Sequence, residues 1–178
     1  MWSEKTKFLS VMAFEGKRVK FESDRSFEQV REELHSLVPK TMPTETYPEA
    51  MKKAGGLNRA TFESVVQSQL GEYGFMLFHE FDFSIWLPLY GVNRKVARLI
   101  LGNPLIAITM IRHDVDAALF TPVELLLRES DTGEGSAIIY DLPSSLIAIR
   151  ENPPLLDVAL ELDRKLEAVV RRAMGGSK

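Results

Sequence analysis

The stretch that decides the fold lies in the middle of the chain, where residues 95–112 are KVARLILGNPLIAITMIR. Lys95 to Leu101 is apolar enough for a strand in a protein interior. Gly102-Asn103-Pro104 then predicts a helix start, because asparagine caps helices and proline already has the backbone angle of the first helical position. We expect this helix to reach about Arg112. The side chains expected on its inner face are Leu105, Ile108 and Ile111.

Further strands are predicted on both sides of this stretch. Before it, Tyr73 to Asp82 is a strand rich in aromatic residues. Phe83 to Tyr90 is apolar but interrupted by Pro88, which predicts an irregular segment or a short helix. After it, Pro122 to Glu129 and Ser136 to Asp141 are two strands joined by a loop with two glycines, the pattern of a hairpin. This part of the chain thus predicts four strands around one helix.

The two ends of the chain add a strand and two long helices. Lys17 to Ser23 alternates apolar and charged residues, as a half-buried strand does. A helix follows from Ser26 to Pro39, with Gln29 at the position that completes a capping box. At the other end, Asn152-Pro153-Pro154 begins a helix that we expect to reach about Met174.

The order of these elements places the chain in the α+β class. Counting a second helix from Ala60 to Leu70, the order is β, α, α, β, β, α, β, β, α, which lacks the alternation of a doubly wound fold. We expect a two-layer sandwich, in which one mostly antiparallel or mixed sheet of about five strands is covered by helices. Residues 1–16 are an N-terminal extension. Residues 17–178 are a single domain, with an insertion at about 39–58.

Composition excludes several classes of function. The chain has no cysteine, which rules out disulfides, thiolate metal ligands and a cysteine nucleophile. The formal net charge of −3, from 22 basic and 25 acidic residues, gives no basic surface for nucleic acid. The longest uncharged apolar stretch, Leu99 to Ile111, is too short and too interrupted to span a bilayer. We therefore expect a cytoplasmic protein without nucleic-acid or membrane partners, and no motif predicts a cofactor.

Several short motifs follow one another in a specific order. They are Gly74-Phe75, His79-Glu80-Phe81-Asp82, Arg98-Leu99-Ile100-Leu101-Gly102-Asn103-Pro104, Pro122-Val123-Glu124-Leu125 and Tyr140-Asp141-Leu142-Pro143. From about Lys17 onward the chain resembles the domain-of-unknown-function 302 family, with mild departures at Phe81 and Leu142. The resemblance implies a two-layer α+β domain that pairs as a homodimer, and it implies no established activity. The apolar run Phe83 to Tyr90 also favours a homodimer, because a domain of this size cannot easily bury it.

The first candidate cluster is His79-Glu80-Phe81-Asp82. On a strand, Glu80 and Asp82 face one side of the sheet and His79 faces the other. Two carboxylates on one face suit acid–base chemistry or a hard cation. The simpler alternative is the end of a strand that emerges into solvent, where such residues are merely exposed.

The second candidate cluster joins Arg98 with Gly102-Asn103-Pro104. Free N–H groups at a helix start favour anions, and a guanidinium group binds carboxylates or phosphates in bidentate fashion. Alternatively, Asn103 is only a cap and Arg98 pairs with Glu80 or Glu124. Because Arg98 shares its face of the strand with two apolar residues, we predict that it is largely buried, within salt-bridge reach of Glu80 or Glu124, and at the border of the main pocket.

The third candidate cluster is Arg112-His113-Asp114-Val115-Asp116. A His-Asp pair suggests a metal phosphohydrolase, but such enzymes need further His and Asp ligands, and the chain has only three histidines. Ordinary residues at a helix C-terminus explain the cluster more simply, so we predict no metal site. Ser144-Ser145 lacks the context of a catalytic nucleophile and is better explained as the start of a short helix.

Three functions remain open. The favoured one is a non-catalytic domain that binds or senses a small anionic or polar ligand as a homodimer. Its candidate ligand-binding residues are Arg98, Glu80, Asp82, Asn103, His79 and Glu124. The second is an enzyme of unrecognised class that uses Glu80 and Asp82 with His79 or His113, and the third is a purely structural interaction module. A pocket that contains Arg98 and Glu80 favours the first two functions over the third.

Overall fold

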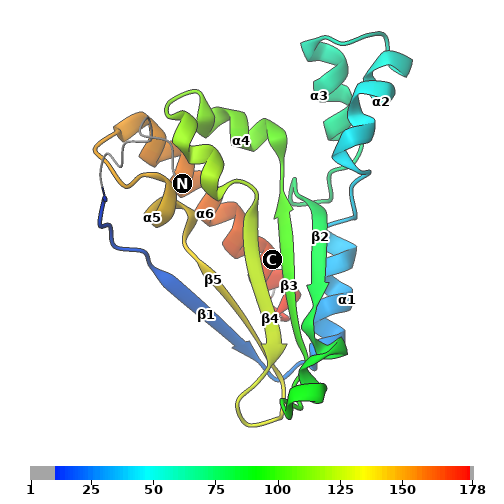
Figure 1. The fold of residues 1–178 in the computed structure, drawn as a ribbon, viewed down its shortest axis with the longest axis vertical. Coiled ribbons are helices and arrows are strands. Elements are labelled where there is room, and N and C mark those ends of the chain that lie inside the picture. Colours follow the sequence, from blue (N-terminus) through cyan, green and yellow to red (C-terminus); the bar gives the residue numbers. More distant parts are fainter. Residues whose placement is uncertain (1–10, 177–178) are drawn as a thin grey trace, which may run out of the picture.

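A computed structural model describes residues 11–176, which form a five-stranded sheet with helices packed on one face (Figure 1). The strands are β1 (Arg18–Ser23), β2 (Met76–Asp82), β3 (Val96–Gly102), β4 (Val123–Glu129) and β5 (Ser136–Asp141). Their order across the sheet is β1-β5-β4-β3-β2, and every neighbouring pair is antiparallel. The predicted α+β fold with about five strands is confirmed. Residues 1–10 of the predicted N-terminal extension lie outside the described residues.

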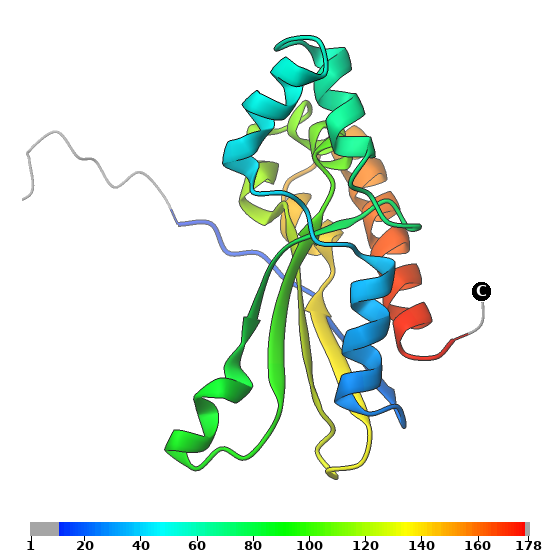
Figure 2. The same ribbon diagram turned by 90° about the vertical axis from the view of Figure 1, so that its right-hand side faces the viewer.

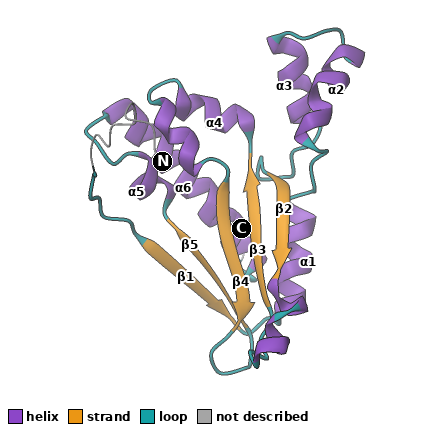
Figure 3. Ribbon diagram, in the orientation of Figure 1, coloured by secondary structure: helices purple, strands orange, loops and turns teal. Residues whose placement is uncertain are grey.

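Two long helices form the second layer, and shorter ones surround the upper end of the sheet (Figure 3). The long helices are α1 (Phe27–Leu37) and α6 (Pro153–Ala173). The shorter helical elements are η1 (Thr44–Thr46), α2 (Tyr47–Lys53), α3 (Arg59–Gln67), α4 (Pro104–Ile111), η4 (Val115–Phe120) and α5 (Pro143–Ile147). Both α1 and α6 lie on the same side of the sheet (Figure 2), and the described residues place no helical layer over the middle of the opposite face. None of the described helices is both long and apolar enough to cross a membrane.

The period-two alternation of the strands decides which side chains enter the core. In β3, Ala97, Leu99 and Leu101 are almost completely buried beneath the helices, whereas the residues between them are only half-buried. The apolar stripe of α6 packs against this face, and Leu166 and Val169 are fully buried. Each fully buried aliphatic side chain of this kind stabilises the fold by about 1.5–3 kcal/mol. We refer to the opposite side of the sheet as the open face.

The start of α1 follows the predicted capping box. The Oγ atom of Ser26 accepts a hydrogen bond from the Gln29 backbone N–H at 3.2 Å, and the Gln29 side chain accepts one from the Ser26 backbone N–H at 2.9 Å. These reciprocal bonds satisfy two N–H groups that a helix start otherwise leaves free. They fix where α1 begins after β1, and so they position its side chains over the sheet.

The chain between α1 and β2 forms a helical hairpin beyond the upper end of the sheet (Figure 1). α2 and α3 pack together, and Tyr47, Val66 and Met76 make a small core separate from the main one. The insertion predicted at about residues 39–58 contains η1 and α2. Asn58 caps α3 by accepting a hydrogen bond from the backbone N–H of Thr61 at 3.0 Å.

The packing of α4 differs from the expected one. Ile108, predicted on its inner face, is 49% exposed, whereas Met110 is fully buried. Leucine, isoleucine, alanine and methionine occupy nearly every position of this helix, so its sequence has no polar side from which to deduce the buried one.

The connection from β2 to β3 projects from the open face as an arm, which we define as residues 83–92. It contains two short 3-10 helices, η2 (Phe83–Ile85) and η3 (Leu87–Tyr90), in agreement with the predicted irregular or short helical segment. In Figure 2 the arm bends away from α1 and α6 at the lower end of the sheet. The arm therefore projects from the open side of the sheet.

Candidate functional site

The two carboxylates of β2 face the helices, and His79 faces the other way. In the register of β2 with β3, Glu80 is opposite Leu99 and Asp82 is opposite Ala97, both of which are buried under the helices. His79 is opposite Ile100 on the open face. Residues directly opposite each other share a face of the sheet. The predicted separation of His79 from the two carboxylates is confirmed.

Side chains of α1 engage both carboxylates. The Nε atom of Arg31 donates a hydrogen bond to Oε1 of Glu80 at 2.7 Å, and Nε2 of His35 lies 2.8 Å from Oε2 of the same residue. Arg31 also lies 3.2 Å from Oδ2 of Asp82. The Glu80 side chain is only 14% exposed, and both of its oxygens have partners. The cluster therefore ties α1 to the edge strand and leaves neither oxygen of Glu80 free.

Arg31 and His35 were not among the residues selected from the sequence. They lie four residues apart on α1, and such residues share one side of a helix. This spacing was the available signal, because it placed two potential cations on one side of α1. Their common partner in β2 follows only from the packing of α1 on the sheet.

Arg98 lies on the open face and pairs with Glu124 of the neighbouring strand. Its Nε atom donates a hydrogen bond to Oε2 of Glu124 at 2.9 Å, and its terminal nitrogen contacts the same oxygen. The predicted salt-bridge reach to Glu124 is confirmed. The prediction that Arg98 is largely buried is wrong, since its side chain is 42% exposed. Glu80 cannot be its partner, because Glu80 lies on the other side of the sheet.

Asn103 holds the start of α4 in place. Its Oδ1 atom accepts a hydrogen bond from the Leu105 backbone N–H at 2.8 Å, and its Nδ2 atom donates one to the carbonyl oxygen of Gly74 at 2.9 Å. The N–H groups of Ile106 and Ala107 both donate to the carbonyl oxygen of Asn103, and Pro104 has no N–H group. The first turn of α4 therefore presents no unbonded N–H group of the kind that binds anions at helix starts.

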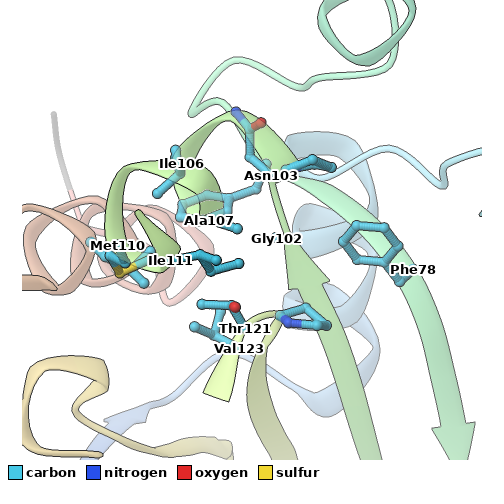
Figure 4. Close-up of a pocket in the computed structure, with 13 residues that line it drawn as sticks. Phe78, Gly102, Asn103, Ile106, Ala107, Met110, Ile111, Thr121 and Val123 are labelled. Atoms are coloured by element: carbon cyan, nitrogen blue, oxygen red, sulfur yellow. The ribbon is translucent and has the colours of Figure 1, made fainter. Parts of the chain in front are cut away.

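A small apolar pocket lies beneath α4, and we call it the α4 pocket (Figure 4). Its volume is about 180 Å³. Residues of α4, of the first half of β2, of the end of β3, of the start of β4 with the segment before it, and of α6 line it, among them Phe78, Ala107, Met110, Ile111 and Val123. Asn103 and Thr121 contribute its polar side chains, and both form hydrogen bonds with the protein, Thr121 to the carbonyl oxygen of Ala117 at 3.4 Å. The pocket thus offers a ligand mainly apolar contacts.

A wider groove of about 550 Å³ crosses the upper part of the open face, and we call it the open-face groove. Leu126 and Ile139, which are opposite each other in β4 and β5, lie within it. Its walls include Leu119 of η4 and Leu146 of α5. Two ion pairs also line it, Arg98 with Glu124 and Arg18 with Asp141. Arg98 therefore borders this groove, whereas Asn103 borders the α4 pocket.

The remaining candidates have local structural partners. Oδ1 of Asp114 accepts a hydrogen bond from the Asp116 backbone N–H at 2.9 Å, which caps η4. The carbonyl oxygen of His113 lies 3.4 Å from Nδ2 of Asn152 at the start of α6. Between residues 11 and 176, no group of three or more His, Asp and Glu side chains is placed to hold a metal ion.

Two aspartates and one tyrosine on the strands and hairpin of the sheet have shifted pKa values. Hydrogen bonds from Arg18 lower the pKa of the Asp141 carboxyl, with bond lengths of 2.7 and 2.9 Å. Hydrogen bonds from Arg128 and then Arg94 lower the pKa of Asp131 well below its usual range. On the helical side of the sheet, burial raises the pKa of Tyr140 to about 12, with smaller contributions from nearby carboxylates. The two aspartates therefore stay ionised beside their arginines at neutral pH.

Comparisons with known proteins agree with this architecture. Residues 57–173 match the model of a protein family described as domain of unknown function DUF302. The crystal structure of an uncharacterised conserved DUF302 protein from Bacillus stearothermophilus superposes with a TM-score of 0.58 at 16% sequence identity. The similarity covers 88% of this chain and 97% of that one, and at this identity it shows the shared fold alone. A search of curated proteins gave no match. Because the family model covers well over half of its residues, the chain belongs to the family of the domain of unknown function DUF302.

Proposed function

We propose that the protein is a non-catalytic domain that binds a small ligand, and that the α4 pocket receives the apolar part of that ligand. The observation that carries the proposal is the character of the pocket, whose lining is mostly apolar and whose polar side chains already have partners. A concave pocket with a mostly apolar lining and a few polar groups is the usual form of a small-molecule site, and this one lies beside a fixed helix start.

The volume of the pocket limits the size of the group that fits. An engineered apolar cavity of about 150 Å³ holds one benzene molecule, and the α4 pocket has about 180 Å³. A single aromatic ring or a short branched alkyl chain therefore matches it. A carboxylate or phosphate does not, because burying such a charge without a partner is costly. The anionic or polar ligand expected from the sequence gains no support at Arg98, whose guanidinium group is bonded to Glu124.

The same geometry weighs against the two alternatives. An enzyme that uses Glu80 and Asp82 needs carboxylates accessible to substrate, whereas both are engaged by Arg31 and face the helices. A purely structural module has no need of an apolar cavity. Binding of a small molecule is thus the function that the described residues support best.

A thermal-shift screen with the full chain tests the proposal. Small apolar probes such as benzene, indole and isobutanol are expected to raise the melting temperature, because a ligand that binds only the folded state stabilises it. Ala107→Phe fills the pocket from α4 and is expected to abolish the shift. Ile108→Phe adds the same ring at the next position, outside the pocket lining, and keeps the response. Equal responses of the two variants would place the binding site elsewhere.

We also propose that the domain acts as a homodimer. Large apolar side chains on the arm are exposed in the single chain, and Ile85, Leu89 and Tyr90 are each at least 79% exposed. Exposed apolar clusters of this kind usually mark an interaction site. Light scattering at micromolar concentration should give about twice the chain mass of 20.1 kDa; a mass of one chain would contradict the proposal.

A cytoplasmic location also stays a proposal, to be checked by fractionation of cells that make the protein.

A further inference from the structure

The arm is a fixed element with an apolar tip. At its base, Oγ of Ser84 accepts a hydrogen bond from the Val96 backbone N–H at 3.0 Å, and the Ser84 backbone N–H donates to Asp82 at 2.9 Å. A chain of ring contacts joins it to the open face, with ring centroids 6.5 Å apart for Phe81 and Phe83 and 5.8 Å for Phe83 and Trp86. A preorganised apolar tip loses less conformational entropy on docking than a flexible loop does.

The arm and the open-face groove lie at opposite ends of one surface. The arm follows the last residue of β2 and precedes β3, at the lower end of the sheet (Figure 2). The groove lies at the upper end, where β4 and β1 begin and β5 ends. Any two-fold axis that brings one arm onto the partner's groove brings the second arm onto the first groove as well. The surface is therefore able to pair with a copy of itself through two equal contacts.

The arm and the groove match in charge and polarity. Residues 83–92 contain no charged side chain. The groove has apolar side chains at its floor and walls, and its two arginines are neutralised by Glu124 and Asp141. An uncharged apolar tip thus enters the groove without leaving a charge unpaired, which would be costly in an interface.

We propose that in a homodimer the arm of each copy docks in the open-face groove of the other, so that each groove is completed by the partner's Trp86, Leu89 and Tyr90. This inference rests on the proposed homodimer and specifies which surfaces of its two copies contact each other. Five strands spaced about 4.8 Å apart and six or seven residues long give the sheet a flat area of roughly 500 Å². Stable interfaces bury about 800 Å² on each partner, so the arm and the groove supply what the sheet alone lacks.

A second copy fits this surface better than a lipid bilayer does. The arm projects from the sheet (Figure 2), so a flat bilayer would touch the tip of the arm and would not reach the open-face groove at the other end of the sheet. Anionic membranes also attract unpaired basic residues. The cations next to the arm, Arg94 and Lys95, are paired with Asp131 and Glu28. These two basic residues, the described ones next to the arm, therefore offer no unpaired positive charge for membrane docking.

Engineered cysteines test this geometry directly, because the chain has no native cysteine. Full-length Leu89→Cys, on the arm, is mixed with tagged Leu119→Cys, at the groove, and treated with a short bis-maleimide. We expect a cross-linked product that contains one chain of each kind. Leu57→Cys is the matched control, since it places an exposed leucine position on the connection between α2 and α3. Mixed with Leu119→Cys, it should give no such product.

Light scattering on the same samples separates the two proposals. A dimer that gives no product between the arm and groove positions overturns the docking geometry and leaves the homodimer standing. A product from Leu89→Cys alone, with arms linked to each other, also overturns it. A monomer overturns both. A second set of variants checks the contact without cross-linking. Leu89→Asp should weaken dimerisation more than tenfold, and adding Leu119→Lys to the same chain should restore most of the lost affinity. The control Leu57→Asp should leave dimerisation unchanged.

Discussion

Replacing Asn103 with alanine removes two hydrogen bonds that the structure assigns to its side chain. One caps α4 through the Leu105 N–H, and the other reaches the carbonyl oxygen of Gly74 before β2. A lost cap costs about 1 kcal/mol, and a lost hydrogen bond costs about the same. Asn103→Ala should therefore lower the free energy of unfolding by about 2 kcal/mol. For a chain of this size, that corresponds to a fall in melting temperature of about 4–8 °C.

A graded series makes this prediction sharper. Asn103→Asp keeps the oxygen that caps α4 but loses the donor to Gly74, so it should cost about half as much. Asn152→Ala is the matched control, because Asn152 caps α6 with a bond of 3.2 Å and its second contact is a longer one of 3.4 Å. Urea and thermal denaturation of the four proteins give the comparison. If Asn103→Ala melts with the wild type, or Asn103→Asp costs as much as Asn103→Ala, the reasoning fails. If Asn103→Ala keeps the stability of the wild type but no longer binds the small apolar probes, the Asn103 side chain acts in ligand binding and not in stability.

Two further predictions concern a glycine pair and a tyrosine. Gly133 and Gly135 both have φ +83°, but a Cβ at Gly133 meets open space and one at Gly135 would lie 2.2 Å from the Ser23 carbonyl oxygen. Gly133→Ala should therefore cost about 1 kcal/mol, and Gly135→Ala at least twice as much in urea denaturation; equal costs would contradict the contact. Tyr140 has a pKa raised to about 12 from the ordinary 10.0. Because the unfolded chain loses this proton first, stability should fall as pH rises from 10 to 12, and Tyr140→Phe should reduce that fall in denaturation curves at the two pH values. An unchanged pH dependence would show that Tyr140 does not cause it.

The alternation of residues along the strands predicted how side chains divide between the two faces. His79 was expected on the other face of β2 from Glu80 and Asp82, and the register agrees. Arg98 likewise lies on the other face of β3 from its buried sequence neighbours. Alternation does not say which face the helices cover, because apolar residues occur on both faces of β3. The half-buried apolar neighbours of Arg98 therefore suggested a buried arginine, whereas helices pack on the opposite face.

The residues of the candidate site come together from distant parts of the chain, and a local sequence pattern does not show which distant residues will meet. Glu80 finds its partners 45 and 49 residues earlier in the chain, on α1. The α4 pocket likewise combines side chains of α4 with Phe78 and Val123, which belong to three different parts of the sequence. Local signals such as the Asn-Pro start of α4 were reliable because the residues concerned act on their immediate neighbours.

The order of strands in the sheet determines how this chain is assembled as it is synthesised. β2, β3 and β4 each pair with the next strand along the chain, so the strands from β2 to β5 can join the sheet soon after they are made. β1 is made first but pairs only with β5, and Arg18 meets Asp141 123 residues later. α1 also receives α6, the last helix, beside it. β1 and α1 therefore gain these partners only after β5 and α6 have been made, so this side of the fold is completed late in synthesis.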